Sequence, residues 1–269
     1  MAEDLINNKD IYFPSYLGNN DKFITLLNRT SQTLCDWFSK ADKNGPLPFD
    51  ESFKCIMPSV DGDSVEDLFS EIESLLNNSF NPVHPGSLAH LDPPPLIFSI
   101  LGDLIAAGLN NNLLAYELSP SATLLEESLC KWFAKKIGFN DLSGGIAASG
   151  GTLSNLNALI AARNNAGLGT NPNSVLLVSE DAHSSFVKCI RVMGLDTKNL
   201  VKIKTDNQGR MDINDLRKSI DKCSIENKKI FAIVATLGTT VRGAIDPVKE
   251  ISEICKQRNI WQSSVKSIF

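Results

Sequence analysis

Segments with the pattern of β-strands alternate with segments with the pattern of α-helices through the second half of the chain. Strand-like apolar runs occupy residues 146–149, 174–179, 200–204 and 230–236. Helical spacing of apolar residues occurs over 153–166, 184–193 and 213–222, and a last helix begins at Asp246 and Pro247. Because this order lets the strands pair in parallel while the helices cover both faces, it predicts an α/β fold with a mostly parallel sheet.

The first 94 residues have a helical pattern instead. Apolar side chains at helical spacing predict a helix over residues 21–41, and a capping box that begins at Ser64 predicts a second helix that reaches about Leu76. Residues 81–95 end in three successive prolines, which cannot donate backbone hydrogen bonds, so we expect a loop there. The expected division is a helical segment with its loop over 1–94 and a larger domain over 95–269.

Two further helices are expected before the strands begin. One starts at Pro95, and the other has Ser119 as its N-cap, Pro120 in its first turn and Gly138 at its end. Proline in the first turn and glycine just past the last turn are strong boundary signals, because each suits the backbone at that position. The sequence therefore predicts helices, joined by loops, up to the first predicted strand.

Composition excludes several classes of protein. The 269 residues are 42% hydrophobic, which suffices for a sizeable core, and the net charge of −5 disfavours nucleic acid as a partner. The six cysteines form no C-x-x-C pair, so we expect free thiols in a reducing compartment. The N-terminus has no signal-peptide pattern, and the most apolar segment, residues 96–109, is too short to span a bilayer. We expect a cytoplasmic protein.

A glycine corner joins the first predicted strand to the helix that follows it. Ser149, Gly150, Gly151 and Thr152 precede the apolar residues of that helix, so free backbone N–H groups meet the positive end of the helix dipole. The corner is either a phosphate site or a tight turn that needs glycine for its geometry alone. A nucleotide triphosphatase loop would have lysine in place of Gly151, and no G-x-G-x-x-G pattern of dinucleotide sites occurs. A single phosphate, as on a small cofactor, fits better.

Two other polar segments directly follow predicted strands. His183 comes after one of them, where its imidazole could stack on an aromatic ring, transfer a proton, or only cap the next helix. Thr236, Thr239 and Thr240 end the last predicted strand, and their hydroxyls either contact a ligand or serve the turn. Because ligands of such sheets bind beyond the carboxyl ends of the strands, we expect both segments near the glycine corner.

The proline-rich loop contains a second group of polar side chains. His84, His90 and Asp92 lie close together in sequence and could suggest a metal site. Their spacing fits no common zinc pattern, and the sequence has no H-E-x-x-H motif. We therefore expect no metal there, but a loop that is structural or faces a substrate.

Taken together, these motifs resemble those of the group II pyridoxal-phosphate-dependent amino-acid decarboxylases, the family of glutamate, aromatic amino-acid and diaminobutyrate decarboxylases. Five stretches carry the resemblance, in the order that the family has them: His84-Pro85-Gly86 with the proline loop, Ser119-Pro120 through Glu126, Ser149 to Arg163, Asp181 to Ser185, and Ala235 to Thr240 with Gly243 to Pro247. The resemblance runs from about residue 20 to Trp261 and is specific because the five stretches keep the family's order and intervals.

The resemblance implies a fold, a cofactor and a reaction. The fold would be that of the fold type I pyridoxal-phosphate enzymes, which are usually homodimers, and the reaction would be decarboxylation of an L-amino acid. By position, Gly151 and Thr152 would hold the cofactor phosphate, His183 would stack on the ring as the catalytic histidine, and Thr240 would lie against the cofactor. The loop with His84 and Pro93 would face the substrate.

The sequence departs from the family after Trp261. The family has a His-Val-Asp-Ala-Ala strand after a tryptophan, which provides the acid for the ring nitrogen, and a Schiff-base lysine further on. Here residues 262–269 contain no acid, and Lys266 has none of the family's context. We expect a chain that is truncated or frame-shifted near Gln262, with a sheet that ends early and without the Schiff-base lysine. The alternative is a non-catalytic remnant or a dimerisation partner of a full-length decarboxylase, whereas an α/β enzyme for nucleotides is disfavoured by the missing phosphate-loop residues.

Overall fold

The structure is a computed structural model of the 269-residue chain, and it describes residues 14, 20–44, 64–88 and 93–266. The chain divides into two compact units, residues 1–110 and 111–269, which are described separately below. Among the described helices, none is both long and apolar enough to cross a membrane. The division expected from the sequence, at residue 94, stays a prediction.

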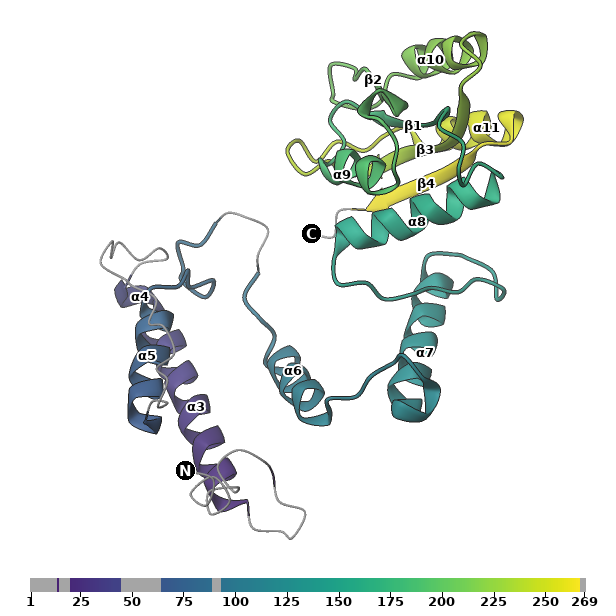
Figure 1. The fold of residues 1–269 in the computed structure, drawn as a ribbon. Helices are drawn as coiled ribbons and strands as arrows, with labels where there is room; N and C mark the ends of the chain where they lie inside the picture. The colour runs from purple at the N-terminus through teal and green to yellow at the C-terminus, as the bar shows by residue number, and fades with distance from the viewer. Residues whose placement is uncertain (1–13, 15–19, 45–63, 89–92, 267–269) are drawn as a thin grey trace. The chain divides into compact units, whose positions relative to one another are not determined.

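The first unit is helical, as predicted. Its helices are α3 (Asp21–Ser39), α4 (Ala41–Asn44), α5 (Val65–Asn77) and α6 (Ile97–Leu109) (Figure 1). The capping box of α5 forms, since the Ser64 hydroxyl accepts from the Asp67 backbone and the Asp67 carboxylate accepts from the Ser64 backbone. Arg29 of α3 makes an ion pair of 2.7 Å with Glu66 of α5 and stacks its guanidinium 4.0 Å from the Phe69 ring centroid. The two helices are thereby joined.

The second unit contains the parallel sheet that the sequence predicts. Its elements are η1 (Tyr116–Leu118), α7 (Pro120–Lys136), α8 (Gly151–Asn165), β1 (Ser174–Ser179), α9 (Ser185–Val192), η2 (Thr197–Asn199), β2 (Leu200–Ile203), α10 (Ile213–Ile225), β3 (Lys229–Leu237), α11 (Val248–Arg258) and β4 (Trp261–Lys266) (Figure 1). The strand order is β2-β1-β3-β4, and every neighbouring pair is parallel. The α/β fold class is confirmed, and most element boundaries lie within a few residues of those expected.

Two expectations were wrong, and a third was confirmed only in part. Residues 146–149 form no strand, because no strand in the described part of the chain lies beside them to pair with. Ile146 is 72% exposed, and the Ala147 N–H donates to a side-chain oxygen, Glu126 Oε1, at 2.7 Å. The sheet does not end at β3, since the segment after Ile260 adds β4, which pairs with residues Ala232–Leu237 of β3. Ser119 occupies the N-cap position of α7 as expected, but its hydroxyl makes no cap hydrogen bond; its φ is −159° and its ψ is 61°.

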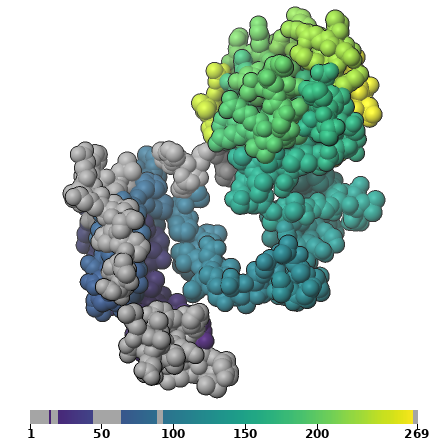
Figure 2. Space-filling model, viewed as in Figure 1, coloured from purple at the N-terminus to yellow at the C-terminus, as the bar shows by residue number. Residues whose placement is uncertain are grey.

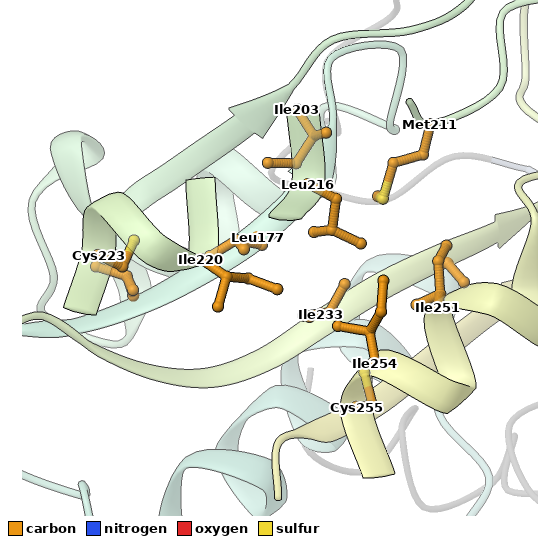
Figure 3. Close-up of a cluster of buried hydrophobic side chains, with 12 residues drawn as sticks. Leu177, Ile203, Met211, Leu216, Ile220, Cys223, Ile233, Ile251, Ile254 and Cys255 are labelled. Atoms are coloured by element: carbon orange, nitrogen blue, oxygen red, sulfur yellow. The ribbon is translucent and has the colours of Figure 1, made fainter. Parts of the chain in front are cut away.

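Two hydrophobic layers hold the sheet between its helices. On one face, residues such as Leu177 and Ile233 pack against Leu216 and Ile220 of α10 and Ile254 of α11 (Figure 3). On the other face, alternate residues of β1 and β3 pack against α8 and α9, including Leu176, Val178, Val234, Leu159 and Phe186. The strands and these helices form one densely filled body, from teal to yellow in Figure 2. Helices on both faces follow from strands that are apolar on both sides.

A buried arginine fixes the C-terminal end of α8. Arg163 is 7% exposed, and its guanidinium donates to the carbonyls of Leu168, Met193 and Asn171 at 2.9, 2.9 and 3.1 Å. Burial lowers the pKa of Arg163. The guanidinium thereby ties the end of α8 to the segments that follow α8 and α9.

Candidate functional site

The carboxyl ends of β1 and β3 lie side by side, and α8 begins at the same edge. The loop after β1 carries His183, and the loop after β3 carries Thr239 and Thr240. The first turns of α8 and α9 are joined, because Asn155 Nδ2 donates to Ser185 Oγ at 3.1 Å and Cys189 Sγ lies 3.7 Å from the Thr152 carbonyl oxygen. This edge, beyond the ends of parallel strands, is where such sheets bind ligands.

The first turn of α8 leaves backbone donors free. No side chain caps the helix, and its first helical hydrogen bond runs from Ser154 N to the Gly150 carbonyl at 3.1 Å. Among the described residues, no acceptor bonds to the N–H groups of Gly151, Thr152 and Leu153. Apart from their chain neighbours and the helix backbone, no heavy atom lies within 4 Å of a Cβ built on Gly150 or Gly151, so the space beside these two glycines is open. Three aligned N–H groups at a helix N-terminus form an anion site.

The imidazole of His183 is held by the backbone that follows it. Its Nδ1 accepts from the Ser185 N–H at 3.2 Å, and its carbonyl accepts from the Phe186 N–H at 3.2 Å. Phe186 is buried in the core, so this turn is anchored. His183 itself is exposed. Because Nδ1 is an acceptor, the neutral ring carries its proton on Nε2, which is then a donor toward a ligand.

The threonines at the end of β3 and in the loop after it have different environments. Thr239 is structural, since its hydroxyl accepts from the Ala244 N–H at 3.1 Å and its carbonyl accepts from the Gly243 N–H at 2.8 Å. Thr240 is exposed at the loop surface. Thr236 is buried, and its Oγ1 has no hydrogen-bond partner in the described structure. A buried hydroxyl without a partner at a strand end marks a candidate ligand contact, and no signal in the sequence separates Thr236 from its neighbours.

Most carboxylate oxygens at this edge interact with other groups of the chain. Both carboxylate oxygens of Asp246 accept backbone N–H bonds, from Met211 at 2.8 Å and Thr236 at 2.7 Å, and burial raises the pKa of Asp246. Asp181 Oδ2 lies 3.4 Å from Arg242 Nε, but it is buried and has no hydrogen-bond partner among the described residues. Hydrogen bonds from the backbone and hydroxyl of Thr205 lower the pKa of Glu180. Asp246 and Glu180 therefore fix the loops, whereas Asp181 retains an oxygen without a hydrogen-bond partner in the described part of the chain.

The comparison with known proteins decides the family. The family model described as the pyridoxal-dependent decarboxylase conserved domain matches residues 56–262. The chain belongs to the pyridoxal-dependent decarboxylase family. The relatives include L-2,4-diaminobutyrate decarboxylase of Acinetobacter baumannii, 32% identical over 76% of this chain and 44% of the relative, and aromatic-L-amino-acid decarboxylase of Bacillus atrophaeus, 30% identical over 71% and 41%.

Solved decarboxylase structures have the same fold. The glutamate decarboxylase domain of a diaminobutyrate-pyruvate transaminase and L-2,4-diaminobutyrate decarboxylase from Vibrio parahaemolyticus superposes with a TM-score of 0.86 at 24% identity, over 94% of this chain and 59% of that one. Mouse CSAD in its apo form superposes with a TM-score of 0.83 at 25% identity, over 91% and 55%. This decarboxylase-family chain spans less than half the length of the curated relatives that it matches.

The predicted substrate-side residues of this decarboxylase-family chain lie in the first unit. His84 is partly buried, and its Nδ1 accepts from the Gly86 N–H at 2.9 Å, which closes a tight turn; Pro93 is exposed. His90 and Asp92 lie outside the described residues, so the sequence expectation for them has no structural counterpart. Within the described part of the chain, no group of three or more His, Cys, Asp or Glu side chains could hold a metal.

The donor set at the sheet edge fits the phosphate and the ring of pyridoxal phosphate. The free N–H groups of α8 suit one phosphate, and the fixed imidazole of His183 and the unpartnered hydroxyl of Thr236 suit a flat polar ring. The strand β4, which runs beside β3, carries no Asp, Glu or His over residues 261–266. No acid for a ring nitrogen therefore comes from β4.

Proposed function

We propose that this chain forms the cofactor-binding part of a pyridoxal-phosphate-dependent carboxy-lyase that decarboxylates an L-amino acid. The observation that carries the proposal is the meeting of free helix N–H groups, a fixed imidazole and a buried unpartnered hydroxyl at one sheet edge. Family membership supports the same reaction, as do the names of the relatives, which are decarboxylases of 2,4-diaminobutyrate and aromatic amino acids.

The first turn of α8 holds the phosphate in this proposal. The N–H groups of Gly151 and Thr152 donate to its oxygens, and the helix dipole adds attraction for the negative charge. The hydroxyl of Thr152 is a further donor. The missing side-chain cap supports this role, because a capped helix would already have used these donors.

His183 covers the ring, and threonine hydroxyls contact its edge. The Ser185 N–H donates to Nδ1 and so orients the imidazole of His183 toward one side of the loop. Thr236 provides a buried hydroxyl, and Thr240 lies in the loop that follows. When bound, pyridoxal phosphate supplies an electron sink for the charge that remains after CO2 departs. The residues of this chain bind and orient that group.

The remaining parts of the proposal concern substrate, assembly and location. The loop with His84 and Pro93 faces the amino-acid substrate, and the protein is a homodimer in the cytoplasm. The exposed apolar side chains of α6, with Phe98 at 85% exposure and Ile105 at 61%, support burial against a second copy. The five cysteines in the described part of the chain are free, which supports a reducing compartment.

A second candidate function is non-catalytic. The absence of an acid from β4 favours a remnant or a dimerisation partner of a full-length decarboxylase, because ring-nitrogen protonation needs an acid. The two candidates differ in two measurements. Release of CO2 from 2,4-diaminobutyrate, glutamate or an aromatic amino acid supports the enzyme, whereas cofactor binding without release, together with co-purification of a full-length paralogue, supports the second candidate.

Equilibrium titration of the chain with pyridoxal phosphate, followed by tryptophan fluorescence, tests the cofactor site. We expect saturable binding that inorganic phosphate weakens. Thr152→Glu places a carboxylate in front of the free N–H groups and is expected to weaken binding by about tenfold or more, which corresponds to about 1.4 kcal/mol. Asn214→Glu, on the exposed first turn of α10, adds the same charge at another helix start and is the matched control.

The role of His183 has its own pair of variants. His183→Ala should weaken binding of pyridoxal phosphate but leave binding of inorganic phosphate unchanged, because only the former has a ring to stack. His84→Ala, in the other unit, should leave both affinities unchanged. Equal effects of Thr152→Glu and Asn214→Glu, or no saturable binding, would contradict the proposed site.

A further inference from the structure

A groove of about 450 Å³ lies between the edge strand β2 and the helix α10. Its lining includes six lysines: Lys198, Lys202, Lys204, Lys218, Lys222 and Lys228. None of the lining residues belongs to the candidate cofactor site, which uses α8 and the loops after β1 and β3. The inference drawn from this lysine groove is therefore independent of the proposed function.

The carboxylates in the lysine groove do not neutralise it. Glu226 is already paired, at 2.6 Å with Lys228 and at 3.8 Å with Lys222, and the Lys228 hydrogen bond lowers the pKa of Glu226. Asp215 accepts the backbone N–H of Lys204 at 2.9 Å. Among the described residues, no carboxylate forms an ion pair with Lys198, Lys202, Lys204 or Lys218. A strongly positive region thus stands on a chain whose net charge is −5.

Protection of the sheet edge explains only part of this charge. Lysines on an edge strand keep other strands from pairing with it, and Lys202 lies on β2, where it has this effect. Lys218 and Lys222 are on α10, and Lys198 is in η2. Positive charges from three separate elements therefore line one groove. Their mutual repulsion is relieved when an anion binds among them.

The chemistry of the lining selects the class of anion. The lining residues that the structure describes include no arginine and no aromatic side chain, and the apolar ones are Val201 and Cys223. Protein interfaces rely on aromatic and arginine anchors and are depleted of lysine. Nucleic acids are held by stacking and by long basic tracks. Lysine ammonium groups around a short groove suit several phosphates carried close together on one small molecule.

We infer that the lysine groove binds a compact, multiply phosphorylated small molecule. The ammonium groups of Lys198, Lys202, Lys204 and Lys218 neutralise its phosphates, and Lys228 holds Glu226 away from them. Binding at this site changes no covalent bond. The same phosphate chemistry occurs in solution and on lipid headgroups, and the inferred source is the free molecule, because no exposed aromatic or aliphatic anchor for a bilayer lines the groove.

Calorimetric titration of the purified chain with inorganic tripolyphosphate tests the inference. We expect a saturable site, separate from the first turn of α8, whose affinity falls when NaCl is raised from about 50 mM to about 200 mM, because exposed charges are screened. Lys198→Gln/Lys218→Gln should weaken binding by about tenfold or more, since both lysines are exposed and unpaired. Lys249→Gln/Lys256→Gln removes two exposed lysines from α11 and changes the net charge equally, so it is the matched control.

Two more measurements distinguish the lysine groove from the first turn of α8 and from a lipid surface. Thr152→Glu should leave tripolyphosphate affinity unchanged; a loss there would place the anion at α8 and overturn the inference. Vesicles that contain a phosphorylated inositol lipid should sediment no more of the chain than vesicles without it. Equal loss in both double variants, no saturable tripolyphosphate binding, or binding to the phosphorylated vesicles alone would each overturn it.

Discussion

The sharpest test of the fold is conservative replacement of the buried arginine. Arg163→Lys keeps the positive charge but replaces the planar guanidinium with a single ammonium on a shorter stem. The guanidinium donates through three different nitrogens to carbonyls of Leu168, Met193 and Asn171. The Leu168 and Asn171 carbonyls lie in the segment after α8, and the Met193 carbonyl lies after α9. One ammonium cannot donate to all three, so about two of the three hydrogen bonds are lost, although Leu168 and Asn171 keep donors from Asn171 and Ser174.

The expected cost follows from those two bonds. A hydrogen bond from a charged donor contributes about 1.5 kcal/mol or more, so Arg163→Lys should lower the free energy of unfolding by about 3 kcal/mol. With a urea dependence of about 2 kcal/mol per molar, the unfolding midpoint should fall by about 1.5 M. Arg191→Lys, at an exposed position of α9, is the matched control and should change the free energy by less than about 0.5 kcal/mol.

Urea unfolding followed by far-ultraviolet circular dichroism measures both variants. Arg163→Lys within about 0.5 kcal/mol of the parent would refute the reasoning, because it would mean that the three hydrogen bonds contribute no net stability. A shift of the same size in Arg191→Lys would also refute it, since the effect would then come from the general exchange of arginine for lysine.

Three other predictions concern buried groups and one turn. Asp246→Asn should cost about 1–3 kcal/mol, because its amide nitrogen cannot accept the N–H of Met211 or Thr236. Burial raises the pKa of Asp246, so the folded state binds the carboxyl proton more tightly than the unfolded state does. Stability should therefore fall as the pH rises above about 4. Urea midpoints at several pH values should show a smaller fall in Asp246→Asn. Burial raises the pKa of Cys255 to about 11, so mass spectrometry after iodoacetamide treatment should find Cys255 alkylated far more slowly than the exposed Cys35. Gly209→Ala should destabilise the protein more than Gly194→Ala in thermal melts. Both glycines have positive φ, but only at Gly209 would the new Cβ lie 2.9 Å from another side-chain atom, Arg242 Cδ. Arg242→Ala should therefore reduce the difference.

The local signals in the sequence determined most element boundaries. Pro120 starts α7, the capping box at Ser64 forms, and Gly138 and Gly167 end their helices with positive φ. These features act within a few residues, so their outcome can be read without knowledge of the rest of the chain. The order of strands and helices predicted the parallel sheet for a similar reason, since few topologies accept it.

What the sequence did not reveal depends on distant partners. Ile146 has an apolar run typical of a strand, yet no strand lies beside it to pair with. Trp261 to Lys266 is polar at Gln262, Ser263 and Ser264, but the edge of β3 organises it into a strand. The unpartnered hydroxyl of Thr236 is visible only once burial is known. In each of these cases tertiary context outweighed local preference.

The central strand β3 contributes to both hydrophobic layers, with Ile233 and Ala235 in one and Ala232 and Val234 in the other. A ribosome delivers α8, β1 and α9 well before it delivers β3. Neither hydrophobic layer can therefore be completed until synthesis has passed Leu237. Between the synthesis of α9 and that of β3, the apolar faces of the earlier elements remain accessible to chaperones. Slow codons placed shortly before β3 would lengthen the interval, whereas slow codons after α11 would leave it unchanged.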